Sequence, residues 1–275
     1  MRSEDAPVAA APVPPLRPPR VDPGALAAKL ARIQPQWPKS RYPVAPAARG
    51  IDCRRVKCVA LTYDDGPGQY TGKLLDILAR YNARATFFVV GQMVAGDGPN
   101  NLRRMVTEGH EIGNHSWSHA QLTALSDAGI RGELGRTQQI VHYMTGRWMT
   151  VMRPPYGSTN QRVAAVARSK GLAQILWSLD TMDWRDRDSV VVTRRATGAT
   201  PGSIVLMHDI HGTTVEAAPH VLERLTAAGY TFVTLSEMYG KLTPGKEYFG
   251  ETEPARQAAG NGRTSDRLKN KGSRT

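Results

Sequence analysis

The segment Thr62-Tyr63-Asp64-Asp65-Gly66-Pro67 follows directly on the apolar run Val59-Ala60-Leu61. The apolar run predicts a buried strand and Gly-Pro predicts a turn, so two carboxylates lie where the strand ends. Side chains alternate between the two faces of a strand, and we expect Asp64 and Asp65 to point in different directions. One can then bind a metal ion while the other handles a proton. An isolated Asp-Gly-Pro usually only makes a turn, and the rest of the chain decides between these interpretations.

Short β-rich runs alternate with amphipathic stretches between residues 56 and 235. This alternation predicts parallel strands joined by helical crossovers, and seven strands favour a barrel or a strongly curved sheet. No Gly-x-Gly-x-x-Gly follows the first strand, which argues against a dinucleotide-binding fold. The expected strands are 56–63, 85–90, 110–114, 149–153, 173–178, 203–207 and 230–234; the expected helices are 72–81, 100–108, 127–144 capped by Ser126, 160–170, 188–197 and 215–229.

Four further polar motifs follow in order, each near the end of an expected strand. In barrels of parallel strands, catalytic groups gather at the loops that follow the carboxyl ends of the strands. We therefore expect all five motifs to meet at one rim. The four motifs are His115-x3-His119, Arg153-Pro154-Pro155-Tyr156, Asp180-x2-Asp183-Trp184 and Leu206-Met207-His208.

His115 and His119 are four residues apart, which places two imidazoles on one side of a helix or tight turn. With a carboxylate they make a three-ligand metal site that leaves positions open for water, an arrangement suited to hydrolysis. Such a pair is otherwise a polar turn without metal, and the nearby Asp64 and Asp65 favour the metal interpretation. His110, at the start of a strand, is expected to be a structural or surface residue.

The two prolines after Arg153 stiffen its backbone and can fix its guanidinium. A fixed cation beside a carboxylate favours the ionised form, so Arg153 facing Asp64 would keep that residue an oriented base. The alternative is an ordinary surface ion pair. The turn at Tyr156 can aim a backbone N–H at an oxyanion.

A histidine held by a carboxylate on one ring nitrogen can give a proton from the other, which suggests a pairing of Asp183 with His208. Trp184 and Leu206 can line an apolar pocket beside it. Spacing alone does not choose among His208 and its nearby competitors, which are Asp209 and His211. The other interpretation of this motif is a buried strand that ends in an ordinary polar residue, and His142 and His220 are expected on helix surfaces.

In this order, the five motifs resemble those of the polysaccharide deacetylases of carbohydrate esterase family four, also called the NodB homology domain. The segment 85–91 also resembles the second strand of that family, and the resemblance spans about residues 56–240. It implies a distorted (β/α)7 barrel in one catalytic domain. Tyr63 stands where the family commonly has Phe, which keeps an aromatic ring at that position.

The resemblance also implies a role for each matching residue. Asp64 would be the general base, tethered by Arg153, and Asp183 would orient His208 as the general acid. The N–H of Tyr156 would stabilise the oxyanion. The implied metal ligands are Asp65, His115 and His119, and the residues around the acetyl methyl are Trp184 and Leu206. One divalent ion is implied; the ligand types and the resemblance favour zinc, and cobalt, nickel or manganese are compatible.

The implied reaction is metal-dependent hydrolysis of N-acetyl groups on N-acetylglucosamine-containing polysaccharide, either peptidoglycan or chitin oligomers, with release of acetate. Three alternatives remain open. The first is an esterase that removes O-acetyl groups from xylan. The second is a wall-binding module whose catalytic site is silent. The third is a nucleic-acid-binding protein that works through basic tails.

Charge is concentrated at the two ends of the chain. Of the formal net charge of +12, residues 1–50 contribute eight Lys/Arg against three Asp/Glu, and residues 251–275 contribute six against three. We therefore divide the chain into a Pro-rich disordered spacer at 1–50, a catalytic domain at 51–243 and a disordered basic tail at 244–275. The central part carries no aromatic-basic platform, so specific nucleic-acid binding is not expected. Basic tails suit attraction to an anionic cell wall.

Cys53 and Cys58 flank the polar pair Arg54-Arg55, which favours a disulfide near the surface over two buried thiols. A disulfide indicates an oxidising compartment. No apolar run of about 20 residues predicts a transmembrane segment, and no signal peptide is visible at the start. We expect a monomer that is extracellular or associated with the cell wall.

Overall fold

The structure is a computed structural model that describes residues 42–43, 45–97 and 100–250. The expected spacer before residue 42 and the expected tail after residue 250 lie outside the described residues. Within these ranges, no helix combines the length and the apolar character needed to cross a membrane.

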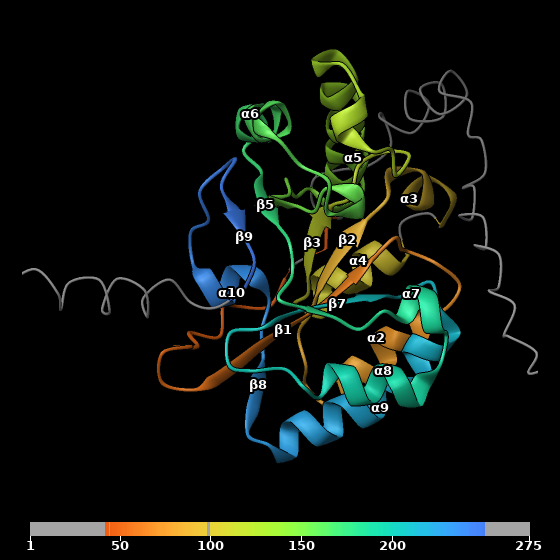
Figure 1. Cartoon of the computed structure of the whole chain (residues 1–275), viewed down its shortest axis with the longest axis vertical. Coiled ribbons are helices and arrows are strands. Elements are labelled where there is room, and N and C mark those ends of the chain that lie inside the picture. Colours follow the sequence, from red (N-terminus) through yellow and green to blue (C-terminus); the bar gives the residue numbers. More distant parts are fainter. Residues whose placement is uncertain (1–41, 44, 98–99, 251–275) are drawn as a thin grey trace, which may run out of the picture.

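The described strands form one sheet in which every pair is parallel. The order is β6-β7-β1-β2-β3-β4-β5-β9, and β8 pairs with the first residues of β1. The sheet curves into an open half-barrel (Figure 1), which confirms the expected distorted (β/α)7 barrel. The strands are β1 (Lys57–Asp64), β2 (Thr86–Val89), β3 (Glu111–Asn114), β4 (Val151–Met152), β5 (Ala173–Ile175), β6 (Leu179–Asp180), β7 (Ile204–His208), β8 (Tyr230–Phe232) and β9 (Glu247–Tyr248).

Helices cover the outside of the sheet. α2, α8 and α9 pack together on one side, and α5 packs with α3, α4 and α6 on another (Figure 1). Two short 3-10 turns lie at Leu122–Ala124 and Pro155–Gly157. The helices are α2 (Thr71–Arg80), α3 (Gly91–Asp97), α4 (Asn100–Thr107), α5 (Asp127–Thr145), α6 (Gln161–Ser169), α7 (Asp183–Asp186), α8 (Ser189–Ala196), α9 (Gly212–Ala227) and α10 (Leu235–Tyr239).

All seven expected strands and all six expected helices are present, with ends shifted by a few residues. The side chain of Ser126 accepts a hydrogen bond from the N–H of Gly129 at 3.2 Å, so the expected cap of α5 is confirmed. Five elements were not expected: β6, β9, α3, α7 and α10. Of the two residues in β6 and in β9, one is acidic, and the three helices have four to seven residues, too few for a helical period to be read reliably.

Alternate residues of the strands enter two separate apolar clusters. Val59, Leu61 and Phe87 pack outward against the helices, whereas Ala60 and Phe88 pack into the interior of the half-barrel. Both faces of the strands are therefore buried, as expected for a parallel sheet with helical cover. The alternation also directs the last inward-facing residues of the strands towards the open end of the half-barrel.

Contacts of the fold reach past both expected boundaries of the catalytic domain. β9 pairs with β5 beyond residue 243, so the folded part extends past the expected start of the tail. Before residue 51, Arg49 donates Nε–H and Nη2–H to the carboxylate of Glu237 at 2.8 and 2.6 Å, which ties the end of the expected spacer to α10. The Cys53–Cys58 disulfide is confirmed, although Cys58 is buried and not near the surface.

Candidate metal and catalytic site

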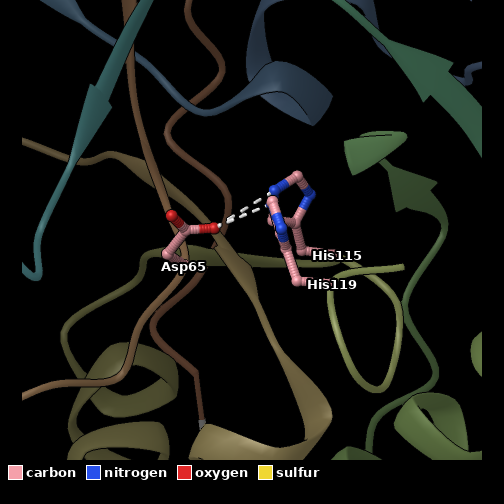
Figure 2. Close-up of side chains that lie close together, drawn as sticks. All are labelled: Asp65, His115 and His119. Carbon is pink, nitrogen blue, oxygen red and sulfur yellow. Dashed lines mark ion pairs between the residues drawn. The ribbon is translucent and has the colours of Figure 1, made fainter. Parts of the chain in front are cut away.

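Asp65, His115 and His119 come together at the carboxyl ends of β1 and β3. Figure 2 shows the carboxylate of Asp65 facing both imidazoles. Its Oδ1 lies 3.4 Å from Nε2 of His115 and 3.2 Å from Nε2 of His119, and the three ligand atoms lie within 4.8 Å of one another. These are the three residues expected to bind a metal ion.

The donor set fits a divalent cation. Asp65 Oδ1 is buried and has no hydrogen-bond partner among the described residues, so its negative charge faces the histidines without a proton donor. A tetrahedral ion about 2.0–2.1 Å from each ligand separates ligand atoms by roughly 3.4 Å, close to the two distances seen here. His115 Nδ1 lies 2.8 Å from the carbonyl oxygen of Arg153, which can only accept; the proton is therefore on Nδ1 and the lone pair on Nε2.

Strained backbone surrounds the ligands. Asp65, Ser116 and His119 have φ values of 74°, 64° and 58°, in the left-handed region that non-glycine residues rarely adopt. Tyr156 also has a positive φ, 62°. Such conformations are retained where the surrounding structure enforces them, often at functional sites.

Glu133 of α5 is one residue that enforces the conformation of the 115–119 loop. Its Oε2 accepts hydrogen bonds from the N–H groups of Trp117 and Ser118 at 2.9 and 2.8 Å, and its Oε1 accepts from the Ser118 hydroxyl at 3.0 Å. The loop that carries both histidines is therefore fixed to a helix by one carboxylate. No pattern in the sequence predicts this contact, because an exposed helix face also carries Glu at such positions.

The pKa values of Asp65 and His119 favour the forms that bind cations. Burial raises the pKa of Asp65, but the neighbouring histidines, His115 first, more than offset it and hold the pKa below the usual range. Burial and the nearby His115 lower the pKa of His119 to about 4. A carboxylate and neutral imidazoles are the protonation states that ligate metals.

Arg153 is fully buried and holds Asp64. Its Nη1 donates to Asp64 Oδ1 at 2.7 Å and to the hydroxyl of Thr62 at 2.8 Å. Its Nε and Nη2 donate to the carbonyl oxygens of Ile175 and Leu176 at 3.2 and 3.0 Å. The other oxygen of Asp64, Oδ2, lies 3.6 Å from Nε2 of His115. Asp64 is thus fixed beside the cluster of Asp65, His115 and His119. Because Arg153 is buried, the alternative of a surface ion pair is wrong.

Asp183 holds His208. Asp183 Oδ1 lies 2.8 Å from His208 Nδ1, and its Oδ2 accepts from the His208 N–H at 2.7 Å and from the Thr214 hydroxyl at 2.6 Å. Burial raises the pKa of Asp183, but these bonds keep it below the usual value. Because Nδ1 faces the carboxylate, Nε2 is the nitrogen of His208 available to a reactant.

The surroundings of His208 favour its charged form. Burial lowers its pKa, but the hydrogen bond and charge of Asp183, with smaller effects of Asp65 and Asp64, raise it to about 9. Asp64 and His208 are register partners on the neighbouring strands β1 and β7, so the base and acid candidates lie side by side.

The remaining candidates divide by exposure. Leu206 is buried two residues before His208, on the same face of β7, whereas Trp184 and Tyr156 are exposed. The ring of Tyr156 lies edge-on to that of His119, with their centroids 4.7 Å apart, so its side chain borders the cluster of Asp65, His115 and His119.

The two competitors of His208 have other partners. Asp209 is buried and accepts a hydrogen bond from the Thr71 hydroxyl, and His211 contacts Arg187. His110 is buried and accepts the N–H of Ala85, as its structural interpretation requires. Of the two helix histidines, His220 is exposed and His142 is half-buried against Trp148.

Comparisons with known proteins agree with this geometry. A family model described as polysaccharide deacetylase matches residues 52–175. The chain is 46% identical over 200 residues to the peptidoglycan-N-acetylglucosamine deacetylase PgdA of Listeria monocytogenes, with 72% of this chain and 42% of that protein covered. It therefore spans less than half the length of that relative.

Two further matches cover most of the related chain. The peptidoglycan-N-acetylglucosamine deacetylase of Bacillus cereus is 35% identical over 187 residues, with 66% of this chain and 68% of that protein covered. A solved structure of the T48 deacetylase with substrate is 41% identical, with a TM-score of 0.69 and coverage of 72% of this chain and 99% of that one. The chain therefore belongs to the polysaccharide deacetylase family, carbohydrate esterase family four.

Proposed function

We propose that this protein is a metal-dependent hydrolase that removes N-acetyl groups from N-acetylglucosamine-containing polysaccharide, peptidoglycan or chitin oligomers, and releases acetate. The observation that carries the proposal is the pair Asp64 and His208, side by side and each held by a buried partner, next to an Asp-His-His cluster. The relatives named peptidoglycan deacetylases support the same substrate class.

The residues that would hold the ion are Asp65, His115 and His119, and we propose zinc from their ligand types. A bound divalent ion polarises a carbonyl oxygen and acidifies a water molecule. Arg153 donates a hydrogen bond to Asp64 Oδ1. This bond keeps the carboxylate of Asp64 oriented as a base beside the three ligands.

The chain's own residues supply the proton transfers. Asp64 takes a proton from the attacking water as the new C–O bond forms at the acetamide carbonyl. His208 then gives the Nε2 proton to the amine nitrogen as the C–N bond breaks, and acetate and a free amino sugar result. The N–H of Tyr156 donates to the oxyanion, and Leu206 and Trp184 contact the acetyl methyl.

The held acid favours amide over ester cleavage. The nitrogen of an amide must be protonated before the C–N bond can break. The alkoxide of an ester is a better leaving group and depends less on a proton donor. The carboxylate of Asp183, 2.8 Å from Nδ1 of His208, favours the protonated form of this histidine, which is what an amide substrate requires. We accordingly prefer N-deacetylation to removal of O-acetyl groups from xylan. We place this reaction at the cell wall, outside the membrane, and propose that a monomer performs it.

The direct test is acetate release from N-acetylglucosamine oligomers and from peptidoglycan, before and after chelation and with zinc or cobalt restored. We expect release to be lost on chelation and regained with metal. Release that persists after complete chelation would overturn the metal-dependent mechanism. Release from acetylated xylan alone would replace the deacetylase with the esterase, and release from no substrate would favour a binding protein.

A further inference from the structure

Arg187 follows α7 and is held in one orientation next to the site. Its Nε donates to the carbonyl oxygen of Trp184 at 2.9 Å. Its Nη1 lies 2.7 Å from Nδ1 of His211, and because a guanidinium only donates, the imidazole accepts. The backbone of Arg187 has a φ of 51°, and its side chain is exposed to solvent. An exposed cation is thus fixed by two bonds instead of moving freely.

This cation is one side chain away from the proposed acid. The rings of His211 and His208 lie with their centroids 5.7 Å apart. Burial, together with the charge of Arg187, lowers the pKa of His211 to about 4, so the ring between them is neutral at neutral pH. Trp184, the other partner of Arg187, belongs to the proposed pocket for the acetyl methyl.

The charge of Arg187 has no counterion among the described residues. Its neighbours Arg185 and Arg195 both form ion pairs with Asp186, and the carboxylate of Asp188 accepts two backbone N–H groups at the start of α8. The acceptors of Arg187 are a carbonyl oxygen and a neutral ring. An arginine has five N–H donors, so the two bonds described leave donors free for an incoming anion.

We propose that Arg187 binds a carboxylate of the polysaccharide and so directs the site towards acidic glycans over neutral ones. The inference rests on the proposed function. Peptidoglycan carries carboxylates on its N-acetylmuramic acid units, either on the lactyl group or on the attached peptide, whereas N-acetylglucosamine oligomers carry none. A planar guanidinium with free donors matches a carboxylate in shape and charge.

The test compares glycans that differ only in charge. One pair is peptide-free glycan strands with a free lactyl carboxylate and the same strands with that group converted to an amide. A second pair is soluble peptide-bearing fragments with free and with esterified peptide carboxylates. For each pair, kcat/KM for acetate release gives a ratio of acidic to neutral substrate. The variants are Arg187→Ala and Arg187→Lys, with Arg185→Ala as the matched control, because Arg185 is already paired with Asp186.

We expect Arg187→Ala to lower the ratio about tenfold in one of the two pairs, the loss typical of one charged hydrogen bond, mainly through KM. If the ratio falls in the first substrate pair, Arg187 binds the lactyl carboxylate; if it falls in the second, Arg187 binds a peptide carboxylate. Arg187→Lys keeps the charge and should recover part of the ratio, and Arg185→Ala should leave it within about twofold of wild type.

An unchanged ratio in both pairs for Arg187→Ala, whether or not both rates fall, would mean that Arg187 only supports the loop and would overturn the inference. In that case the wild-type protein still releases acetate and the proposed function stands. Release from no glycan by the wild-type protein would overturn the proposed function and this inference with it.

Discussion

At the scale of single residues, the site distinguishes three carboxylates by giving each a different environment. Asp64 is bound to a fully buried arginine, and Asp183 is bound to a histidine. Asp65, with no proton donor on Oδ1, is left for the cation. Three aspartates with similar intrinsic chemistry thereby acquire three functions, and each division can be tested with one substitution.

Asp64→Asn should reduce acetate release to background and leave the metal bound, because the amide cannot take a proton and the ligand set is intact. The unfolding free energy should fall by about 1–3 kcal/mol, because the buried charge of Arg153 loses its counterion but keeps neutral acceptors. Metal content by elemental analysis and urea unfolding check both expectations. His115→Ala is the contrasting variant, which should lose the metal; substantial turnover by Asp64→Asn would sink the assignment of the base.

Asp183→Asn should lower the pKa of His208 in the metal-free protein. The carboxylate raises this pKa to about 9, and without it burial dominates and moves the pKa below the ordinary 6.5. The stabilisation from protonated His208 is fully present below about pH 6.5 and is lost as pH rises through about 9; the variant should lack it. NMR titration of the imidazole gives the pKa directly. A value that stays near 9 in the variant would show that Asp183 is not its cause.

At the scale of elements, the loop of residues 115–119 depends on α5. The three hydrogen bonds accepted by Glu133 hold a segment in which two residues have a positive φ. The helix itself was predicted from its period and its cap, because both are local. The contact of α5 with the loop was not predicted. The period of a helix does not show which of its carboxylates binds backbone N–H groups of a distant segment.

Glu133→Ala should weaken metal binding about 10- to 100-fold, the usual effect of losing a residue that orients a ligand. Turnover at saturating metal should fall much less, because Asp64 and His208 lie on other elements. Zinc affinity measured by chelator competition checks the expectation. Glu216→Ala, an exposed carboxylate on α9, is the control. Equal zinc affinities for the two variants would show that Glu133 does not position the ligands.

Element length explains most of what sequence reasoning missed. Apolar runs of the length of β1 and β7 reveal a strand and its carboxyl end, and motifs placed at those ends converge in the structure. β6 and β9 each have two residues, one of them acidic, and so show no apolar run, whereas the equally short β4 contains only apolar residues. The left-handed backbone conformation of Arg187 could not be predicted either, because a positive φ at a residue other than glycine leaves no signature in the sequence.

At the scale of the whole molecule, residues 45–50 are part of the fold. Arg49 and Arg84 both pair with Glu237, whose side chain also closes a capping box with Thr234 at the start of α10. Ala45 packs against the outer core. Composition alone suggested a spacer here, since a Pro-rich segment does not reveal a contact with a residue almost 190 positions away.

A chain beginning at residue 51 should be less stable than one beginning at residue 42, by about 1–3 kcal/mol, because it loses the Arg49 pair and the packing of Ala45. Arg49→Ala in the longer chain should account for about 1 kcal/mol of this difference. Urea unfolding of the three proteins checks the values, and acetate release at 25 °C should be similar in all three. Equal unfolding midpoints would restore residue 51 as the boundary.

The anchoring of Arg153 bears on how such enzymes diversify. Two of the groups that hold its guanidinium are the carbonyl oxygens of Ile175 and Leu176, which every amino acid supplies. Sequence drift at these two positions therefore leaves the base in place, provided that the residues still fill the interior. Rim positions that carry no proposed ligand or catalytic group, Arg187 among them, can change without moving the reaction centre. New glycan preferences can thus evolve on an old catalytic frame by substitution at such positions alone.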